Sequence, residues 1–374
     1  MAKVALMRCS EYQEELIRAQ VERALELINY PLPDLSGKNV LIKPNLLAAV
    51  PPESAVCTHP LVVKVLIKLF QEQGAKVFVG DSPAVESLPR AAKHAGILDV
   101  VAATGSELVD FSEVVEVDVP AGRIVKKLPL AKPVVEADFI VSVAKLKTHG
   151  LTRYTGAVKN LFGCIPGKRK AQFHLRMSEI QDFAGLLVDI YSAVAPDLVV
   201  IDGIVGMEGA GPRNGEPRRV ESLLISADGH SCDLVAGQLI GLSAGQIPTV
   251  RSAIRFGLLN PEEVLVVGET PESFGLAGRF KLPPDTRGVS VNLPDFILRR
   301  LTSLLTAKPV LVPELCLGCE VCAHSCPPQV ISIINHKANF DYTDCIRCYC
   351  CQELCPHGAI KIKTSWLSRL FESR

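Results

Sequence analysis

The chain reads Cys316-Leu317-Gly318-Cys319-Glu320-Val321-Cys322-Ala323-His324-Ser325-Cys326-Pro327 near its C-terminus, a C-x2-C-x2-C-x3-C-P spacing. The same spacing returns as Cys345-Ile346-Arg347-Cys348-Tyr349-Cys350-Cys351-Gln352-Glu353-Leu354-Cys355-Pro356. Three thiols on a tight turn can face one centre, whereas a fourth thiol must arrive from elsewhere in the fold. Each proline stops the short helix that the run would otherwise continue, because proline lacks the N–H group. The repeat therefore predicts a small C-terminal domain organised around its cysteines.

This spacing is similar to that of bacterial ferredoxins, in which the fourth cysteine of each run ligates the other cluster. Zinc sites usually pair two C-x2-C knuckles across a longer gap, so the spacing favours iron–sulfur over zinc. We expect two 4Fe-4S clusters. The expected ligands are Cys316, Cys319, Cys322 and Cys355 for cluster one, and Cys345, Cys348, Cys351 and Cys326 for cluster two.

The composition fits a large domain followed by a small one. The chain has 374 residues, of which 48% are hydrophobic, and a formal net charge of +0. It can therefore bury a large core, and it lacks the basic footprint of a nucleic-acid-binding protein. No apolar run reaches transmembrane length, and the first residues lack the apolar region of a signal peptide. Because 13 cysteines occur without a secretory signal, we expect a reducing cytoplasm, of an anaerobe.

Short aliphatic runs alternate with helical stretches up to about residue 295. The alternation predicts an α/β domain, with a large mostly parallel sheet and helices on both faces. Residues 114–119 and 123–130 predict an inserted β-hairpin. We expect this domain at 1–295, a linker at 296–311 with a helix at 296–305, a small α+β ferredoxin-like domain at 312–363 and a tail at 364–374. The expected buried parallel strands are Val40–Ile42, Val77–Val79, Phe139–Val141, Leu198–Ile201, Leu223–Ile225 and Val264–Val267.

Ionisable residues follow directly after five of the expected strands. They occur in Lys43-Pro44-Asn45, Gly80-Asp81-Ser82, Lys145-Leu146-Lys147-Thr148-His149, Asp202-Gly203 and Asp228. Ligands of open parallel sheets bind beyond the carboxyl ends of the strands, so we expect these residues to converge on one crevice. The candidate catalytic residues are Lys43, Asn45, Asp81, Lys145, Lys147, His149, Lys159 and Asp202.

A segment rich in glycine and lysine runs from Gly156 to Lys170. Its glycines let the backbone approach a ligand and its lysines favour an anion, although a solvated loop is the alternative interpretation. It is not a Walker A loop, since Arg169 stands where Ser or Thr is needed. The mixture of lysines and carboxylates fits a small anionic molecule, or a further metal or small-molecule cofactor. The candidate cofactor-binding residues are Gly163, Gly167, Lys168, Glu208 and Asp228.

Together, the motifs of the large domain resemble those of the domain-of-unknown-function 362 family with a fused ferredoxin module. The resemblance spans about residues 38–245 and the C-terminal module, and the family name implies no reaction. It rests on Lys43-Pro44-Asn45, Thr58-His59-Pro60, Gly80-Asp81-Ser82, Lys145-x-Lys147-Thr148-His149, Lys159-Asn160-Leu161-Phe162-Gly163, Asp202-Gly203-Ile204, Met207-Glu208-Gly209-x-Gly211-Pro212 and Asp228-x4-Asp233.

A second resemblance concerns three residues in the order His149-x9-Lys159-x14-His174. Their order and spacing are similar to those of the nickel-pincer cofactor residues of lactate racemases. That resemblance implies a lysine that tethers a pyridinium-derived cofactor and histidines around the metal. The Gly-rich context of Lys159 differs from that of the racemases.

Three functions follow from these observations. The first is a reductase whose clusters deliver low-potential electrons to an anionic substrate or cofactor in the crevice. The second is a ferredoxin-like electron-carrier subunit with a docking domain. The third is a nickel-pincer-type, racemase-like enzyme with accessory clusters. The thiolates and clusters add negative charge to the C-terminal module, so we also expect a redox partner protein to use that face.

Overall fold

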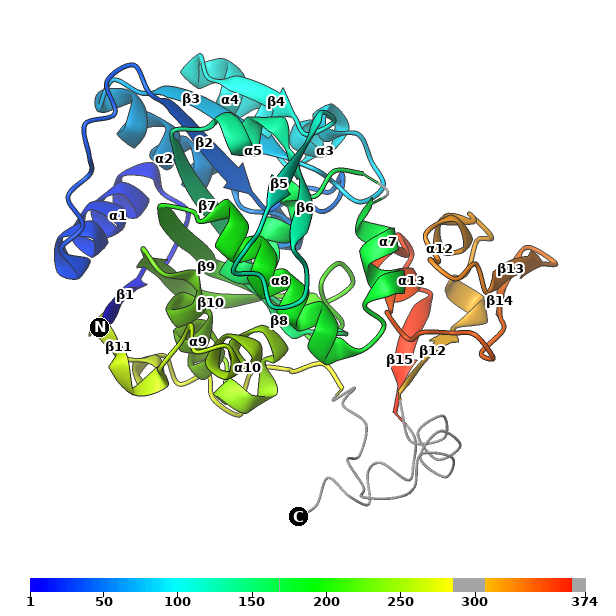
Figure 1. Ribbon diagram of the computed structural model, residues 1–374. Coiled ribbons are helices and arrows are strands. Elements are labelled where there is room, and N and C mark those ends of the chain that lie inside the picture. The colour runs from blue at the N-terminus through cyan, green and yellow to red at the C-terminus, as the bar shows by residue number, and fades with distance from the viewer. Residues whose placement is uncertain (168, 285–306, 365–374) are drawn as a thin grey trace.

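A mixed sheet forms the framework of the large domain (Figure 1). The computed structural model describes residues 1–167, 169–284 and 307–364. Within them, the 9-stranded sheet has the order β11-β1-β10-β9-β7-β2-β3-β4, and β8 pairs with β7. Its strands are β1 (Ala2–Arg8), β2 (Asn39–Pro44), β3 (Lys76–Asp81), β4 (Glu107–Asp110), β7 (Phe139–His149), β8 (Arg153–Thr155), β9 (Leu198–Glu208), β10 (Glu216–Ser226) and β11 (Val264–Gly268).

Five neighbouring strands, β4, β3, β2, β7 and β9, run parallel to one another. Their carboxyl ends therefore meet at one edge of the sheet, which confirms the predicted α/β class and positions the crevice. The parallel orientation expected for Leu223–Ile225 is wrong, because β10 runs antiparallel to both β9 and β1. Only a short turn joins β9 to β10, whereas a parallel return needs a crossover of a dozen or more residues.

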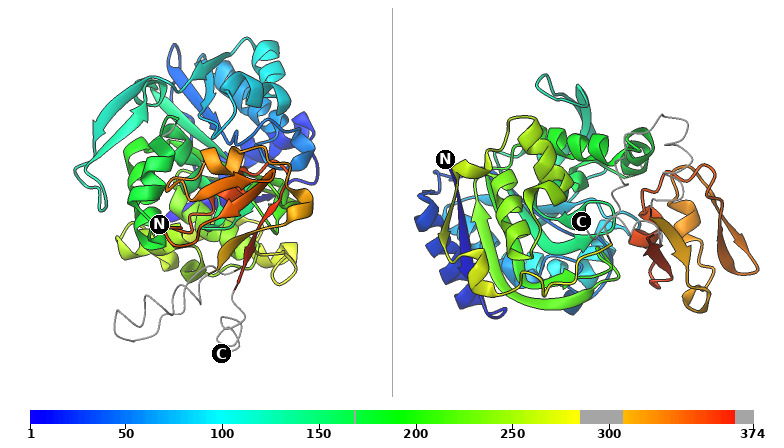
Figure 2. Two further views of the ribbon diagram at one scale, coloured as in Figure 1. Left: turned by 90° about the vertical axis from the view of Figure 1, so that its right-hand side faces the viewer. Right: turned by 90° about the horizontal axis from the view of Figure 1, so that it is seen from below.

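Helices cover both faces of the sheet (Figure 2). One face packs against α1 (Glu14–Ile28), α2 (Pro60–Glu72) and α4 (Ile97–Thr104), and the other against α8 (Ile180–Val194), α9 (Gly229–Leu239) and α10 (Pro248–Arg255). The predicted hairpin is present as β5 (Val114–Asp118) and β6 (Lys127–Ala131), which pair outside the main sheet. The shorter helices of this domain are α3 (Leu88–His94), α5 (Lys132–Glu136), α6 (Ala157–Asn160) and α7 (Arg169–Arg176).

The C-terminal module contains two small antiparallel sheets and two short helices. Strand β12 (Lys308–Leu311) pairs with β15 (Ile360–Lys363), and β13 (Ile331–Ile334) pairs with β14 (Lys337–Phe340). The helices α12 (Val321–His324) and α13 (Cys350–Leu354) each contain the third cysteine of a run, Cys322 and Cys351. Strand β12 lies in the segment expected as linker, so the small fold begins before residue 312. The expected helix at 296–305 and all but the first residue of the tail lie outside the described residues.

None of the helices in the described ranges is long and apolar enough to cross a membrane.

Candidate functional site

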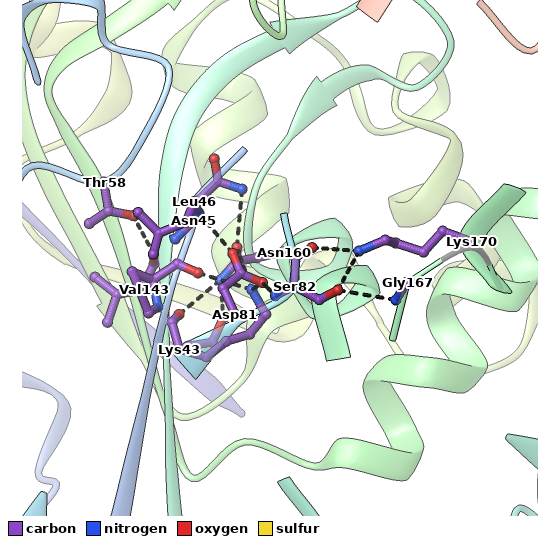
Figure 3. Close-up of polar contacts among 12 residues, drawn as sticks. Lys43, Asn45, Leu46, Thr58, Asp81, Ser82, Val143, Asn160, Gly167 and Lys170 are labelled. Atoms are coloured by element: carbon purple, nitrogen blue, oxygen red, sulfur yellow. Dashed lines mark hydrogen bonds and ion pairs between the residues drawn. The ribbon is translucent and has the colours of Figure 1, made fainter. Parts of the chain in front are cut away.

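A buried ion pair joins the carboxyl ends of β2 and β3 (Figure 3). The Nζ atom of Lys43 lies 2.7 Å from Oδ1 of Asp81, and both side chains are at most 5% exposed. The carboxylate also accepts hydrogen bonds of 2.8 Å from the backbone N–H groups of Leu46 and Ser82. Gly163 packs on this pair, since a Cβ at that position would meet the carboxylate oxygen at 2.1 Å. The pair therefore compensates its own charges and fixes the loops that border the crevice.

A second buried ion pair links β7 to β9. Nζ of Lys145 lies 2.9 Å from Oδ2 of Asp202. The hydroxyl of Tyr12 donates to the carboxylate and accepts from the lysine, both at 2.9 Å. The backbone N–H of His59 also donates to Asp202 at 2.9 Å. The imidazole ring of His59 stacks on the ring of Tyr12, with centroids 3.5 Å apart. Asp202 is thus fully engaged by neighbouring groups.

Lys147 differs from these two lysines because no carboxylate of the described residues forms an ion pair with it. Its Nζ donates to Oδ1 of Asn45 at 2.7 Å and to the carbonyl oxygen of Val56 at 2.6 Å. Both acceptors are neutral, and the side chain is buried. Burial lowers the pKa of Lys147 to about 8. The site therefore contains a buried ammonium whose charge no neighbouring carboxylate directly compensates.

The short helix α6 brings Lys159 and Asn160 to the same place. Four residues cannot hold a helix by themselves, and α6 is anchored by Asp233 of α9. The Asp233 carboxylate accepts hydrogen bonds from the backbone N–H groups of Ala157 at 2.7 Å and Val158 at 3.1 Å. Burial raises the pKa of Asp233 to about 7, against the lowering effect of these hydrogen bonds.

Asn160 connects α6 to the strand ends (Figure 3). Its amide nitrogen donates to the carbonyl of Lys43 at 3.2 Å and to Oγ of Ser142 at 3.0 Å. Its amide oxygen accepts from the side chain of Asn45 at 3.3 Å. This network places two asparagines next to Lys147 and Lys159.

A polar pocket lies where these side chains meet the C-terminal module. The cavity itself is small, ≈ 40 Å³, and it opens to solvent. Its lining residues are Asn45, Leu47, Lys145, Lys147, Thr155, Gly156, Lys159, Asn160, Pro212 and Glu353. All but one of them belong to the large domain. The exception, Glu353, lies on α13 between two cysteines of the second run.

Hydrogen bonds hold α13 against the large domain, on the side shown next to α7 in Figure 1. The side-chain amide of Gln352 donates to the carbonyl of Ala210 at 3.0 Å. Asn214 donates to the carbonyls of Gln352 and Cys355, both at 3.2 Å. The two domains therefore share the pocket.

His149 faces Glu353 with a defined tautomer. Its Nδ1 accepts hydrogen bonds from the backbone N–H groups of Leu151 at 3.0 Å and Thr152 at 3.3 Å. The proton of the neutral ring must then reside on Nε2, which lies 3.3 Å from Oε2 of Glu353 without a well-aligned hydrogen bond. Burial lowers the pKa of His149 to about 4. Burial also lowers the pKa of His174, to about 3.

The carboxylate of Glu353 is stabilised by the groups that surround it. Burial alone would raise its pKa, but the charge of Lys159 and the nearby imidazoles of His149 and His174 hold the pKa well below its usual range. The three residues of the racemase-like pattern, His149, Lys159 and His174, thus lie close enough to influence one another.

The eight cysteines of the two runs line two separate cavities. The sets are Cys316, Cys319, Cys322 and Cys355 for the first cavity, and Cys326, Cys345, Cys348 and Cys351 for the second. Each set takes three cysteines from one run and one from the other. All are free thiols, and such four-thiolate sets match the ligands of a cubane cluster. Within the described ranges, no three or more His, Cys, Asp or Glu side chains are grouped as ligands of a single metal ion.

Of the expected site residues, only Asn45, Lys145, Lys147 and Lys159 line the pocket. Among the others, three expected cofactor-binding residues lie away from it for different reasons. Asp228 lies at the opposite edge of the sheet, because β10 is reversed, and it caps α9 through the N–H groups of His230 and Ser231. Glu208 ends β9 and binds the backbone N–H of Lys281 at 3.0 Å. Lys168 lies outside the described residues.

Two of the expected glycines border the site without lining the pocket. Gly163 packs on the first ion pair, and Gly167 donates its N–H to Ser82 at 3.2 Å. Glu353 is not among the site residues predicted from the sequence. A signal was present, since the two runs are repeats and this position holds His324 in the first run.

Comparison with known proteins identifies the family. The model of a domain of unknown function, DUF362, matches residues 40–238. This chain belongs to the DUF362 family. A 4Fe-4S dicluster domain matches residues 308–356 of this DUF362 protein. The C-terminal module is therefore an iron–sulfur domain of the electron-transfer type.

The DUF362 protein is also similar to a curated relative and to two solved structures. A thylakoid-associated protein of Synechocystis sp. is 36% identical over 269 residues, which cover 69% of this chain and 80% of that protein. The lactate racemase apoprotein from Thermoanaerobacterium thermosaccharolyticum is 15% identical with a TM-score of 0.37, and the match covers 62% of this chain and 56% of that one. A protein from Thermotoga maritima is 14% identical with a TM-score of 0.36, and the match covers 60% and 57%. Both structural likenesses are too distant to support an argument about activity.

Proposed function

We propose that this DUF362 protein is an iron–sulfur reductase that transfers electrons to a small anionic substrate or cofactor in the lysine pocket. One observation carries the proposal. Helix α13 contains Cys351 of one thiol set and is followed by Cys355 of the other, while Glu353 between them lines the pocket. Electron supply and binding site therefore share one helix.

Two 4Fe-4S clusters would be held by the two crossed cysteine sets that line the cavities. When bound, they supply low-potential electrons one at a time. Two such electrons, with two protons from solvent, convert an acceptor A into AH2. A one-electron donor protein would then replace the electrons.

The residues of the pocket bind and orient the anion. Lys147 supplies a buried positive charge, and low local dielectric strengthens its attraction for an anion. Asn45 and Asn160 offer amide groups at the pocket wall. The Lys43–Asp81 and Lys145–Asp202 pairs hold the strand ends rigid around it.

A second candidate function is an electron carrier with a docking domain. The exposed side of the first cysteine set favours it, since Cys319 is exposed and Leu317 next to it is 68% exposed. A redox partner would bind this apolar surface. The anion pocket distinguishes the two functions, because a carrier does not need one.

Reoxidation of the reduced clusters tests the reductase. Protein purified without oxygen, carrying about eight iron atoms, is reduced with dithionite and freed of the reductant. It is then mixed with small molecules that mass spectrometry identifies in material released from the native protein. We expect at least one of these anions to reoxidise the clusters and so remove the signal of the reduced state. The substitution Lys147→Ala should slow this reaction at least about tenfold, the equivalent of about 1.4 kcal/mol.

The matched control is Lys126→Ala, which removes a lysine of the β5–β6 hairpin. It should leave the rate unchanged. Equal reoxidation rates in wild type, Lys147→Ala and Asp202→Ala at full iron content would exclude the pocket as the acceptor site.

A further inference from the structure

The charges around the pocket can be summed from its contacts. Lys145 is neutralised by Asp202 at 2.9 Å, and Lys43 behind it by Asp81 at 2.7 Å. Each pair is buried, so neither member is free to pair with a ligand. These four groups add no net charge to the pocket.

Two lysines remain on the pocket wall. Lys147 donates only to neutral oxygens. Lys159 is half-buried on α6 and lines the same pocket as Glu353. Among the described lining residues, Glu353 carries the only carboxylate.

The nearby histidines do not change the sum. His149 and His174 are buried and neutral at pH 7, since burial lowers their pKa values to about 4 and 3. Lys170 is not a lining residue of the pocket. Its side chain donates to Ser82 and interacts electrostatically with Asp81. The side chains that line the pocket therefore sum to one net positive charge, before the charge of the clusters is counted, and they do so only while Glu353 is in place.

We propose that Glu353 determines the charge specificity of the pocket: by neutralising Lys159 from the iron–sulfur domain, it makes the pocket select a singly charged carboxylate over a doubly charged one. The inference rests on the proposed anion pocket and names its substrate class. A dianion would place its second charge next to the Glu353 carboxylate, which lies in a site with little water to screen the repulsion. Without α13 the same walls would carry two positive charges.

Two ligands of similar size and different charge test the proposal. Glycolate carries one charge and oxalate carries two, and both have two carbon atoms. Their affinities are measured by isothermal titration calorimetry on the full-length, cluster-loaded protein. We expect wild type to bind glycolate more tightly than oxalate. Glu353→Gln should shift the ratio of the two affinities toward oxalate by at least about tenfold.

Three further variants separate charge from structure. Glu314→Gln removes an exposed carboxylate of the same module and should leave the ratio unchanged. Glu353→Asp keeps the charge and should keep the preference for glycolate. Lys159→Gln combined with Glu353→Gln restores one net positive charge, so it should restore that preference as well. Iron content and visible absorbance confirm that each variant retains its clusters.

The outcomes distinguish the two proposals. If glycolate and oxalate both bind but Glu353→Gln leaves their ratio as in wild type, the role given to Glu353 is wrong while the anion pocket stands. If neither ligand binds wild type or any variant, the anion pocket itself is wrong, and the inference falls with it.

Discussion

Lys147 is the residue on which the proposed anion binding most depends. The other buried lysines of the site have carboxylate partners at 2.7 and 2.9 Å, whereas Lys147 has only an amide and a carbonyl oxygen. A buried ammonium without a counter-ion is costly, and its cost falls when an anion binds. The structure therefore maintains a charge that a ligand can neutralise.

The pH dependence of binding follows from this residue. Burial lowers the pKa of Lys147 to about 8, so its charge is present below that pH and is lost as the pH rises through it. Glycolate affinity should fall by about tenfold for one pH unit above that pKa. Calorimetry between pH 6.5 and pH 9.5 measures the decrease.

A substitution separates Lys147 from the other group with a similar pKa. Burial also lowers the pKa of Lys170 to about 8. Arginine keeps its charge throughout this range, so Lys147→Arg should flatten the profile and Lys170→Arg should not. A pH profile that becomes flat only in Lys170→Arg would show that Lys170, and not Lys147, carries the binding charge.

At the scale of elements, α6 depends on a carboxylate that is distant in sequence. Asp233 of α9 accepts the N–H groups of Ala157 and Val158 and thereby places Lys159 at the pocket. The close packing leaves no room for a side chain at position 156, where a Cβ would meet Oδ1 of Asp233 at 2.0 Å. The position of the pocket lysine is thus set by a neighbouring helix.

Two aspartates of α9 give a matched comparison. Asp233→Ala leaves two buried N–H groups without an acceptor, so it should lower the free energy of unfolding by about 3 kcal/mol and weaken glycolate binding. Asp228→Ala removes the N-cap of the same helix and should cost about 1 kcal/mol. Because Asp228 lies at the opposite edge of the sheet, its loss should leave binding unchanged. Urea unfolding and calorimetry measure both effects, and equal binding by the two variants would contradict the positioning role of Asp233.

The strands of the large sheet were predictable from the sequence where the local pattern of residues decides the structure. Aliphatic runs followed by polar residues placed β2, β3, β7 and β9, and thus the lysines at their ends. The direction of β10 was not predictable from its own aliphatic run, because the short turn that precedes it decides the direction. Strand β1 was also missed, since Lys3 and Arg8 flank a short apolar run that gains its partners, β10 and β11, only from distant sequence.

On the scale of the whole molecule, the iron–sulfur domain contributes Glu353 to the polar pocket of the α/β domain. The likeness of the cysteine spacing to that of bacterial ferredoxins predicted which thiols come together, and each cavity is lined by the expected four. The docking of the module was not predictable, because it depends on hydrogen bonds such as those from Asn214 to α13. The role of Glu353 depends on that docking.

The shared helix predicts that ligand binding and cluster reduction influence one another. An anion in the pocket adds negative charge next to α13, which favours the oxidised form of the clusters. Thermodynamic linkage then requires reduction to weaken anion binding by the same factor. A carrier with a separate docking domain would show no such coupling.

A potentiometric titration of the cluster-loaded protein, with and without saturating glycolate, tests this coupling most directly. Glycolate should shift the midpoint potential of at least one cluster to a more negative value, by about 60 mV for a tenfold coupling. Lys147→Ala should lose the shift and keep the clusters. Identical midpoint potentials with and without glycolate, under conditions where calorimetry shows it bound, would contradict the claim that the clusters and the pocket form one reaction centre.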